Sequence, residues 1–446
     1  MDDALPIGQD EAMAICEQAL AASRADETEI NLMASSEGLT RFASNYIHQS
    51  VGETDYRLVV RAALGNKVGV ASTNDTSAEG VSEAARQAGM LAEVASPDEE
   101  YPGLPGPGEP PTPLTGFTAT AEFDAGRRAE AVGTCIEVAR DRDQIAAGAC
   151  SATVSAHAVA NSHGVRAWQE TTRANLRMVF SGDDSSGYAD AHAEDASQIA
   201  PRVLAEAAAG RCARSAGPRS IEPGRLDVIL EPAAVADLLL FLGMSAFSGL
   251  AYHEGRSAIR DRLGEQVCGE NISLVDDPLD PRGLRRAFDF EGVPCGRVEL
   301  IADGVARAVV HDTRTARLEN ARSTGHAPPA SSTYGPVPVN IFLRPGQATM
   351  DEMVSSVDHG LLVTRFHYTN LVDPSAAILT GMTRDGTFLI ENGKLAGGVR
   401  NMRFTEAILE ALSRAEIIGR EGRLAPYAWA PALLIRDFRF SGATEF

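Results

Sequence analysis

His253 and Glu254 are the residues whose types and spacing come closest to a metal site in this chain of 446 residues. They lie in the stretch SGLAYHEGRSAIRD, residues 248–261. In zinc peptidases the motif H-E-x-x-H puts two imidazoles on one face of a helix, and zinc usually takes three protein ligands. Here Ser257 occupies the position of the second histidine, and the next histidine is His311. We therefore interpret the pair as an ordinary loop dipeptide.

A metal site assembled from distant residues is the alternative interpretation. Its ligands would come from the downstream histidines, which are His311, His326, His359 and His367. Histidines this scattered are more often hydrogen-bonded groups of the core or surface. The six cysteines contain no C-x-x-C pair and are expected to be buried free thiols, and no G-x-S-x-G turn of a serine hydrolase occurs. No catalytic or metal-binding residue is therefore assigned.

The composition is that of a folded, acidic protein. Hydrophobic residues make up 44% of the chain, charged residues 23%, and the formal net charge is −21. Such a charge repels nucleic acid on average, and no dense run of Lys and Arg counteracts it. The sequence has no run of eighteen apolar residues, and its acidic start lacks the basic region of a secretory signal. We expect a cytoplasmic protein with no nucleic-acid or membrane partner.

Residues 1–215 are expected to form an N-terminal α/β domain with antiparallel strands. A helix over 10–24, with Asp10 as N-cap, precedes four short strands between residues 29 and 74 and a helix capped by Ser77. Residues 96–114 contain seven prolines and predict an extended connector, which either separates two domains or lies across one. A helix over 124–140, further strands with a turn at 161–164, and a helix from about Pro201 follow.

Residues 216–446 are expected to form a C-terminal, mainly antiparallel β domain. A strand over 225–231 leads into a helix from Pro232 to about Ala246, because proline is tolerated in a first helical turn. Short strands and turns then fill the chain beyond Ala251, with one further helix at about 405–415. The predicted fold class is therefore α+β.

Several segments resemble the TldD/PmbA family, in the family's order. The resemblance spans nearly the whole chain and implies a subunit of a cytoplasmic metallopeptidase that hydrolyses unstructured peptides or peptide-like amides. The segments are RFASNYIHQS, LGNKVGVASTND, LGEQVCGENISLVDDP, FDFEGVP, ELIADGVARAVVHDTRTARLENARSTGHA, VNIFLRPGQATMDEMVSSVDHGLLVTRF, GTFLIENGKL and APALLIRDFRFSG.

The resemblance also implies which kind of subunit this is. The family's metal-bearing subunit, TldD, carries H-E-x-x-x-H and a later cysteine, and it pairs with a partner called TldE or PmbA. The corresponding helix here, near LLLFLGMSAF (238–247), has no histidine, and Ala258 stands five residues after His253. The stretch 417–434, where the cysteine would fall, has none. The chain is thus similar to the metal-free subunit, and zinc or a similar divalent metal is expected in a TldD-like partner.

Five residues are candidates for contacts with a substrate. Ser323, Thr324, Gly325 and His326 form the stretch STGH, which by resemblance lies near the family's substrate groove. The alternative is a plain loop, in which Gly325 permits unusual backbone angles. Arg365 could bind a substrate carboxylate or pair with an internal acid, and the internal pair is favoured.

The sequence therefore predicts the partner subunit of a heterodimeric peptidase, inactive alone, although a homodimer is not excluded. An extended peptide would bind by adding a strand to an exposed sheet edge. Two other functions stay open. One is a stand-alone amide hydrolase with an unrecognised site, and the other is a nonenzymatic binding or regulatory protein.

Overall fold

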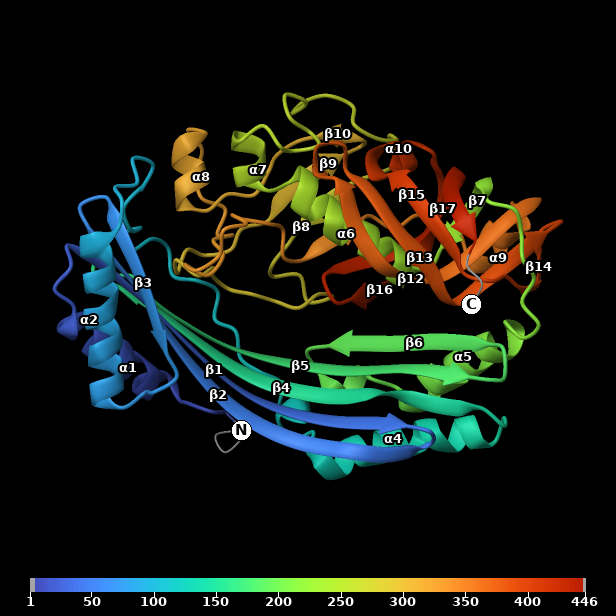
Figure 1. Ribbon diagram of the computed structural model, residues 1–446, viewed down its shortest axis with the longest axis horizontal. Coiled ribbons are helices and arrows are strands. Elements are labelled where there is room, and N and C mark those ends of the chain that lie inside the picture. The colour runs from blue at the N-terminus through green and yellow to red at the C-terminus, as the bar shows by residue number, and fades with distance from the viewer. Residues whose placement is uncertain (1–4, 444–446) are drawn as a thin grey trace.

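The computed structural model describes residues 5–443, and its N-terminal half is built on one six-stranded antiparallel sheet (Figure 1). Neighbouring strands in the sheet follow the order β3-β2-β1-β4-β5-β6. The sheet is long and curved, and its concave face is turned towards the C-terminal half. The strands are β1 (Glu27–Ala43), β2 (Tyr46–Leu64), β3 (Lys67–Thr73), β4 (Ile145–Asn161), β5 (Arg166–Ser181) and β6 (Ser186–Ala193).

The four short strands predicted between residues 29 and 74 are three strands, two of them long. Glu37 and Gly38 look like turn residues in sequence, yet they stay extended because β1 is paired on both sides, with β2 and with β4. The real turn lies at Ser44 and Asn45, which both have positive φ angles of 50° and 61°. Two successive residues with positive φ are typical of the tight turns that join antiparallel strands.

Helices cover the convex face of this sheet. They are α1 (Gln9–Ala22), α2 (Ala78–Val94), α3 (Thr118–Ala121), α4 (Ala125–Arg140) and α5 (Pro201–Arg214), with a 3-10 turn at Ala196–Gln198. The Ser77 side chain accepts a hydrogen bond from the Gly80 amide, which confirms the predicted cap of α2. The predicted cap at Asp10 is wrong, because α1 begins at Gln9 and Gly8 is its N-cap. Alternate strand residues, such as Ile30 on β1, are fully buried beneath the helices.

The proline-rich segment 96–114 contains no helix or strand and lies along the N-terminal sheet. Leu104 and Leu114 are buried, the Asn161 side chain donates to the Pro105 carbonyl at 2.8 Å, and the Glu170 amide donates to the Leu114 carbonyl at 3.2 Å. Because β3 precedes the segment and β4 follows it, the segment connects two strands of one sheet.

The C-terminal half contains a closed ring of five strands. These are β7 (Gly224–Leu230), β12 (His359–Asp373), β13 (Ile378–Glu391), β15 (Met402–Ala407) and β17 (Ala428–Ala443), and β7 closes the ring by pairing with both β12 and β17. Most pairs are antiparallel, which confirms the predicted α+β class. Smaller strands extend the sheet: β8 (Leu274–Asp276), β9 (Val298–Ala302), β10 (Val305–Ala306), β11 (Ile341–Leu343), β14 (Lys394–Gly398) and β16 (Ala415–Ala425).

The helix α6 (Pro232–Ala246) packs its apolar residues against β12, β16 and β17, with the bounds that the sequence predicted. The other helices of this half are short: α7 (Gly249–His253), α8 (Thr313–Leu318), α9 (Met350–Ser355), α10 (Ile408–Ser413) and a 3-10 turn at Pro374–Ala376. The helix predicted at 405–415 is shorter because residues 402–407 pair with β13 and β17 instead. None of the helices within residues 5–443 is long and apolar enough to cross a membrane.

Candidate functional site

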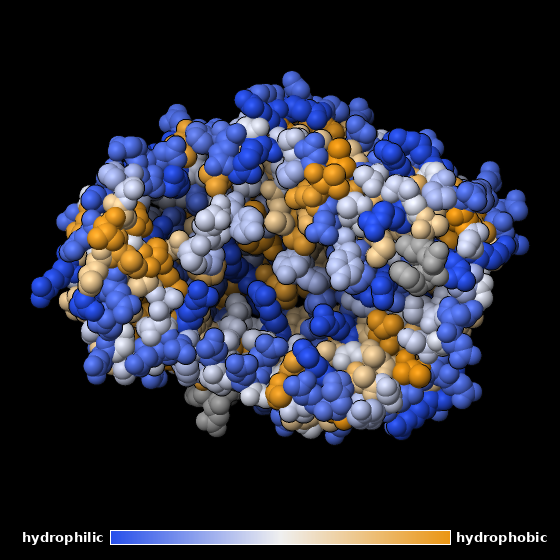
Figure 2. All heavy atoms as spheres, in the orientation of Figure 1, coloured by the Kyte–Doolittle hydropathy of each residue, from blue (hydrophilic) through white to orange (hydrophobic). Residues whose placement is uncertain are grey.

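The two halves enclose a cleft whose floor is the concave face of the N-terminal sheet. Figure 2 shows the molecule hollowed between the sheet and the C-terminal half, with hydrophilic residues around the opening. Strand register explains this polarity, since every second residue points to the concave face. One row across β1, β4 and β5 consists of Ser35, Ser155 and Thr171, all partly buried. This row of the floor thus carries small hydroxyl side chains that can exchange hydrogen bonds with a ligand.

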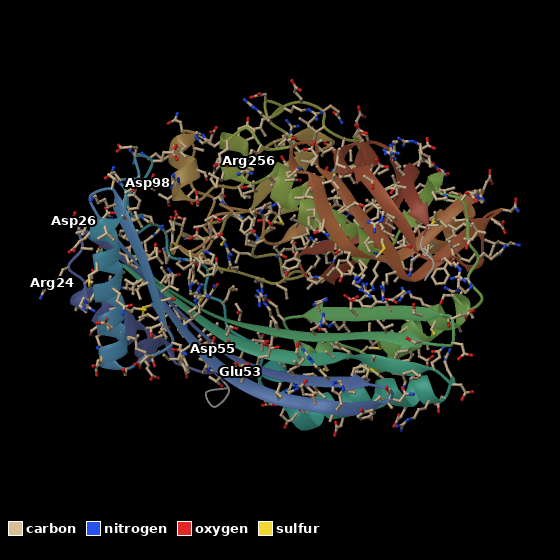
Figure 3. All side chains as sticks on the ribbon, in the orientation of Figure 1. Arg24, Asp26, Glu53, Asp55, Asp98 and Arg256 are labelled. Carbon is tan, nitrogen blue, oxygen red and sulfur yellow. The ribbon has the colours of Figure 1, made fainter. Side chains whose placement is uncertain are left out.

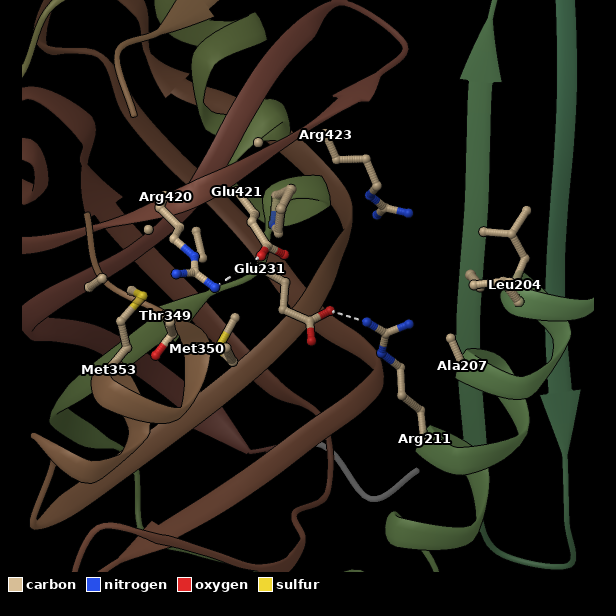
Figure 4. Close-up of a pocket in the computed structure, with 17 residues that line it drawn as sticks. Leu204, Ala207, Arg211, Glu231, Thr349, Met350, Met353, Arg420, Glu421 and Arg423 are labelled. Carbon is tan, nitrogen blue, oxygen red and sulfur yellow. Dashed lines mark hydrogen bonds and ion pairs between the residues drawn. The ribbon is translucent and has the colours of Figure 1, made fainter. Parts of the chain in front are cut away.

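A cavity of about 410 Å³ lies beside the β6 edge of the sheet, between α5 of the N-terminal half and the start of α6, α9 and β16 of the C-terminal half (Figure 4). Met350 and Met353 line one wall and Leu204 the other. Arg211 and Glu231 form an ion pair of 2.7 Å across it. The cavity therefore joins an apolar surface to a neutralised pair of charges.

Arg423 and Asp190 make a second connection between the halves. The Arg423 guanidinium lies 2.9 Å from the Asp190 carboxylate and donates to the Asp190 carbonyl oxygen at 2.6 Å. Burial opposes ionisation of Asp190, but a hydrogen bond from His192 and the charge of Arg423 outweigh it and lower the pKa of this carboxyl. The Asp190 carboxylate thus links the N-terminal sheet to the C-terminal half through Arg423.

Arg365 lies between the two halves but is occupied by internal partners. Its Nε donates to the Asp385 carboxylate at 3.0 Å, and its guanidinium carbon stands 4.2 Å from the centre of the Tyr188 ring. Asp237 on α6 lies nearby, and burial raises its pKa to about 6 while Thr369 donates to it at 3.4 Å. The geometry therefore gives Arg365 the internal ion pair that the sequence analysis favoured over a substrate contact.

In the segment 323–326, Gly325 and His326 are buried, whereas Ser323 and Thr324 are partly buried. The side chains of His326 and Asp276 are fully buried, and Nε2 of His326 is 2.6 Å from the Asp276 carboxylate. The hydroxyls of Ser323 and Thr324 donate to the His311 carbonyl at 3.3 and 3.0 Å. All of these polar groups have partners inside the protein, and these contacts position the segment.

Gly325 is required by the backbone. Its φ is +74°, and a Cβ atom there would clash with the Pro294 carbonyl oxygen. The Gly325 carbonyl accepts hydrogen bonds from the Cys295 thiol at 2.9 Å and from Arg286 at 3.5 Å. Through that carbonyl the segment supports Arg286, a residue that sequence analysis did not single out.

His253 and Glu254 form separate ion pairs on the surface. Nδ1 of His253 lies 2.5 Å from the Glu319 carboxylate, and Glu254 pairs with Arg256. His311 bonds to Thr315 within its own segment. Across residues 5–443, no three side chains of His, Cys, Asp or Glu are grouped so that they could hold a metal ion.

The elements that the resemblance associates with metal ligands do meet in space. Helix α6 packs against β16, but its residues 238–246 are mainly buried and aliphatic, and the Ser245 hydroxyl is bonded to the Phe241 carbonyl. Residues 415–425 of β16 include no cysteine. Cys268 shares the core with α6, but burial raises the pKa of its thiol to about 12. Zinc needs a deprotonated thiolate or neutral imidazole ligands, so this donor set does not fit a metal.

Comparisons with known proteins match the same two halves. The family description "PmbA/TldA metallopeptidase domain 1" matches residues 28–92, and "PmbA/TldA metallopeptidase C-terminal domain" matches residues 223–442. Together the two matches cover more than half of the 446 residues.

Individual relatives agree with the family match. A "Metalloprotease" of Methanothermobacter thermautotrophicus is 24% identical over 60% of this chain and 61% of its own length, and a "Metalloprotease TldD homolog" of Buchnera aphidicola aligns over only 35% of its length. "Metalloprotease PmbA" of Escherichia coli O157:H7 is 23% identical over 84% of both chains. The crystal structure of TldE from Thermococcus kodakarensis has the same fold, with a TM-score of 0.87, 22% identity, and coverage of 97% of this chain and 100% of that one.

Proposed function

Because this chain belongs to the PmbA/TldD family of metallopeptidases, we propose that it is the metal-free subunit of a two-subunit peptidase that hydrolyses extended peptides or peptide-like amides. The TldD-like partner would hold zinc or a similar ion, which in metallopeptidases polarises the scissile carbonyl and activates water. This chain would supply walls of the substrate cleft and part of the subunit interface.

The observation that carries this proposal is the donor chemistry of α6 and β16. These neighbouring elements have the positions that the resemblance assigns to metal ligands, yet residues 238–246 of α6 are mainly apolar with one hydroxyl bonded to its own helix, and β16 has no cysteine or histidine. The concave face of the N-terminal sheet nevertheless carries a row of hydroxyl side chains, Ser35, Ser155 and Thr171. A fold that keeps the cleft without the ligands is suited to binding a substrate that another subunit cleaves.

The edge of β2 is suited to the partner. Within residues 5–443, no strand pairs with the second edge of β2 between Tyr46 and Arg57, because β3 begins pairing only at Leu58. Tyr46 and Val51 are 58% and 43% exposed on this edge. An unpaired strand with exposed hydrophobic side chains favours the addition of another strand. We place the TldD-like subunit at this edge, so that its strand extends the sheet.

The edge of β6 is less available for this purpose. The carbonyl oxygens of Tyr188 and Asp190 accept hydrogen bonds from the side chains of Arg211 and Arg423, at 3.1 and 2.6 Å. A peptide could add to β6 only by displacing both arginines. We therefore expect a peptide in the cleft to be bound by side chains of this chain rather than added as a strand to β6.

The six cysteines lie within the described residues, and all are buried free thiols. Free thiols are the usual state in a reducing compartment, so we propose that the complex acts in the cytoplasm.

Co-expression with a relative that carries H-E-x-x-x-H tests the function. The expected result is a complex in size-exclusion chromatography, with metal in the partner and cleavage of an unfolded peptide that chelation abolishes. The matched control replaces the two motif histidines of the partner with alanine, which should abolish cleavage but leave the complex intact. Chelator-sensitive cleavage by this chain alone would contradict the proposal.

A further inference from the structure

Arginines in the cleft divide into two groups. Four of them are neutralised by carboxylates: Arg211 by Glu231, Arg285 by Glu194, Arg365 by Asp385 and Arg423 by Asp190. Arg173 and Arg177 on β5 and Arg286, in the segment that follows β8, form no ion pair with a carboxylate within residues 5–443, and Arg173 is the one that lies beside the segment containing Arg286. Arg286 is partly buried, and a guanidinium removed from bulk water without a carboxylate in contact is costly, so this unpaired group needs an explanation.

Strand register places Arg173 on the floor of the cleft. On β5 it lies two and four residues from Thr171 and Gln169, and all three side chains point to the concave face. The Gln169 side chain accepts a hydrogen bond from the Ala287 amide at 2.8 Å, which holds the segment containing Arg286 over this part of the floor. The two arginines therefore face the same short stretch of the cleft.

Arg286 is held by neutral groups only. Its guanidinium donates to the Cys295 sulfur and the Gly325 carbonyl, both at 3.5 Å, and stands 6.0 Å from the centre of the Phe290 ring. Burial alone would lower the pKa of Arg286, but the Cys295 thiol and the more distant Asp289 and Asp276 raise it. The group is therefore charged and weakly bonded, with donors left for a ligand.

The positive charge of Arg286 acts on Arg173. Burial lowers the pKa of Arg173, Glu194 and Tyr427 act in the opposite direction, and the charge of Arg286 lowers the pKa by a smaller amount. The Arg173 residue as a whole is nevertheless exposed. Arg173 is thus an exposed guanidinium near a like charge, and a bound anion would relieve the repulsion between the two arginines.

We infer that Arg173 and Arg286 form a carboxylate-binding subsite between the two halves, which holds the C-terminal carboxylate or an acidic side chain of an extended peptide. The inference rests on the proposed peptidase function for the identity of the ligand. Guanidinium groups match the geometry of a carboxylate through paired N–H donors, and the hydroxyls of Thr153 and Thr171 lie on the same floor.

Peptide binding to the full-length chain alone tests the subsite without any cleavage. The probes are one fluorescent pentapeptide as the free acid, as the C-terminal amide, and with an internal Glu in place of Gln. At least one carboxylate peptide should bind more tightly than the neutral amide, and Arg173→Gln should weaken that binding about 10–100-fold, the range for one lost charge-assisted hydrogen bond. The peptide that binds more tightly identifies whether the subsite holds a C-terminal carboxylate or an acidic side chain.

Arg24→Gln is the control, because it removes the same charge at the far end of the N-terminal half (Figure 3) and should leave affinity unchanged. Arg173→Lys keeps the charge but loses the paired donors, so partial binding is expected. Arg286→Gln is informative only where circular dichroism shows a folded protein, so Arg173 carries the test. Equal affinity for all three peptides, or equal losses in Arg24→Gln and Arg173→Gln, would overturn the inference.

The two proposals fail separately. A complex that cleaves peptides with no effect of Arg173→Gln on binding or KM would remove the subsite and leave the peptidase function in place. Carboxylate-selective binding by this chain, without cleavage in the presence of the partner, would do the reverse.

Discussion

His157 makes the stability of the contact between the halves depend on pH. Its ring lies on β4 of the cleft floor, against Phe288 and Phe290 of the C-terminal half at centroid distances of 5.2 and 5.0 Å. Its Nε2 is 2.9 Å from the Asn31 side-chain oxygen. Burial, and then the charge of Arg286, lower the pKa of His157 from 6.5 to about 3. The folded protein therefore holds a neutral imidazole that the unfolded chain protonates below pH 6.5.

The sign and size of the effect follow from linkage. Because the folded-state pKa is depressed, the stabilising contribution is present above pH 6.5 and is lost as the pH falls towards 3. Between pH 8 and pH 5 the unfolded state gains about 2 kcal/mol at this site, at 1.36 kcal/mol per pKa unit. The ring keeps partial access to solvent, so this value is an upper bound.

Urea denaturation at pH 8, 6.5 and 5 measures this contribution. In His157→Gln, which keeps a polar side chain near Asn31, the free energy of unfolding should fall less between pH 8 and pH 5 than in the wild type, by up to about 2 kcal/mol. His48→Gln, at an exposed position on β2, controls for the loss of one histidine. If the free energy of unfolding falls by the same amount between pH 8 and pH 5 in the wild type and in His157→Gln, the argument that His157 is buried in its neutral form is refuted.

Three further substitutions test other parts of the structure. Gly325→Ala should destabilise the protein by about 2 kcal/mol or more in urea denaturation, because φ is +74° and the Cβ meets Pro294; a smaller loss would show that the loop can rearrange. Val51→Lys should weaken association with the TldD-like subunit in sedimentation without altering the circular dichroism spectrum, whereas unchanged association would exclude the β2 edge. Arg365→Met should cost about 2–3 kcal/mol by leaving Asp385 unpaired, and adding Asp385→Asn should recover part of the loss; additive losses would mean that the pair contributes no coupling.

Local patterns predicted those elements whose neighbours do not override them. Helix α6 has Pro232 at its start and a continuous apolar run, so its limits follow from the sequence. The length of strand β1 cannot be predicted from the sequence in this way. The Ser-Glu-Gly stretch around Glu37 favours a turn, and it becomes extended only because β1 is paired on both sides. The short helix α10 shows the same effect, because sheet pairing takes the residues before Ile408.

The site was less predictable because it depends on contacts far apart in sequence. His326 was placed near the groove by resemblance, whereas its partner Asp276 lies fifty residues away and draws it into the core. Alternation along β5 does put Arg173 on one face of the strand, but a single strand does not say which face meets a cleft and which meets helices. Arg286 lies in an irregular segment with no periodic pattern, so only the folded chain brings the two arginines together.

The acidic surface and the unpaired arginines of the cleft act over different distances. A net charge of −21 repels every anion on approach, but salt screens that repulsion beyond about 8 Å at physiological ionic strength. A nucleic acid brings a phosphate to the surface at every nucleotide, so its repulsion accumulates along the whole contact. A peptide carboxylate is repelled once and then reaches two guanidiniums that form no direct ion pair with a carboxylate of residues 5–443. The same charge distribution therefore disfavours polyanions while it permits a single carboxylate in the cleft, which is why the overall charge of this chain is a poor guide to the charge of its ligand.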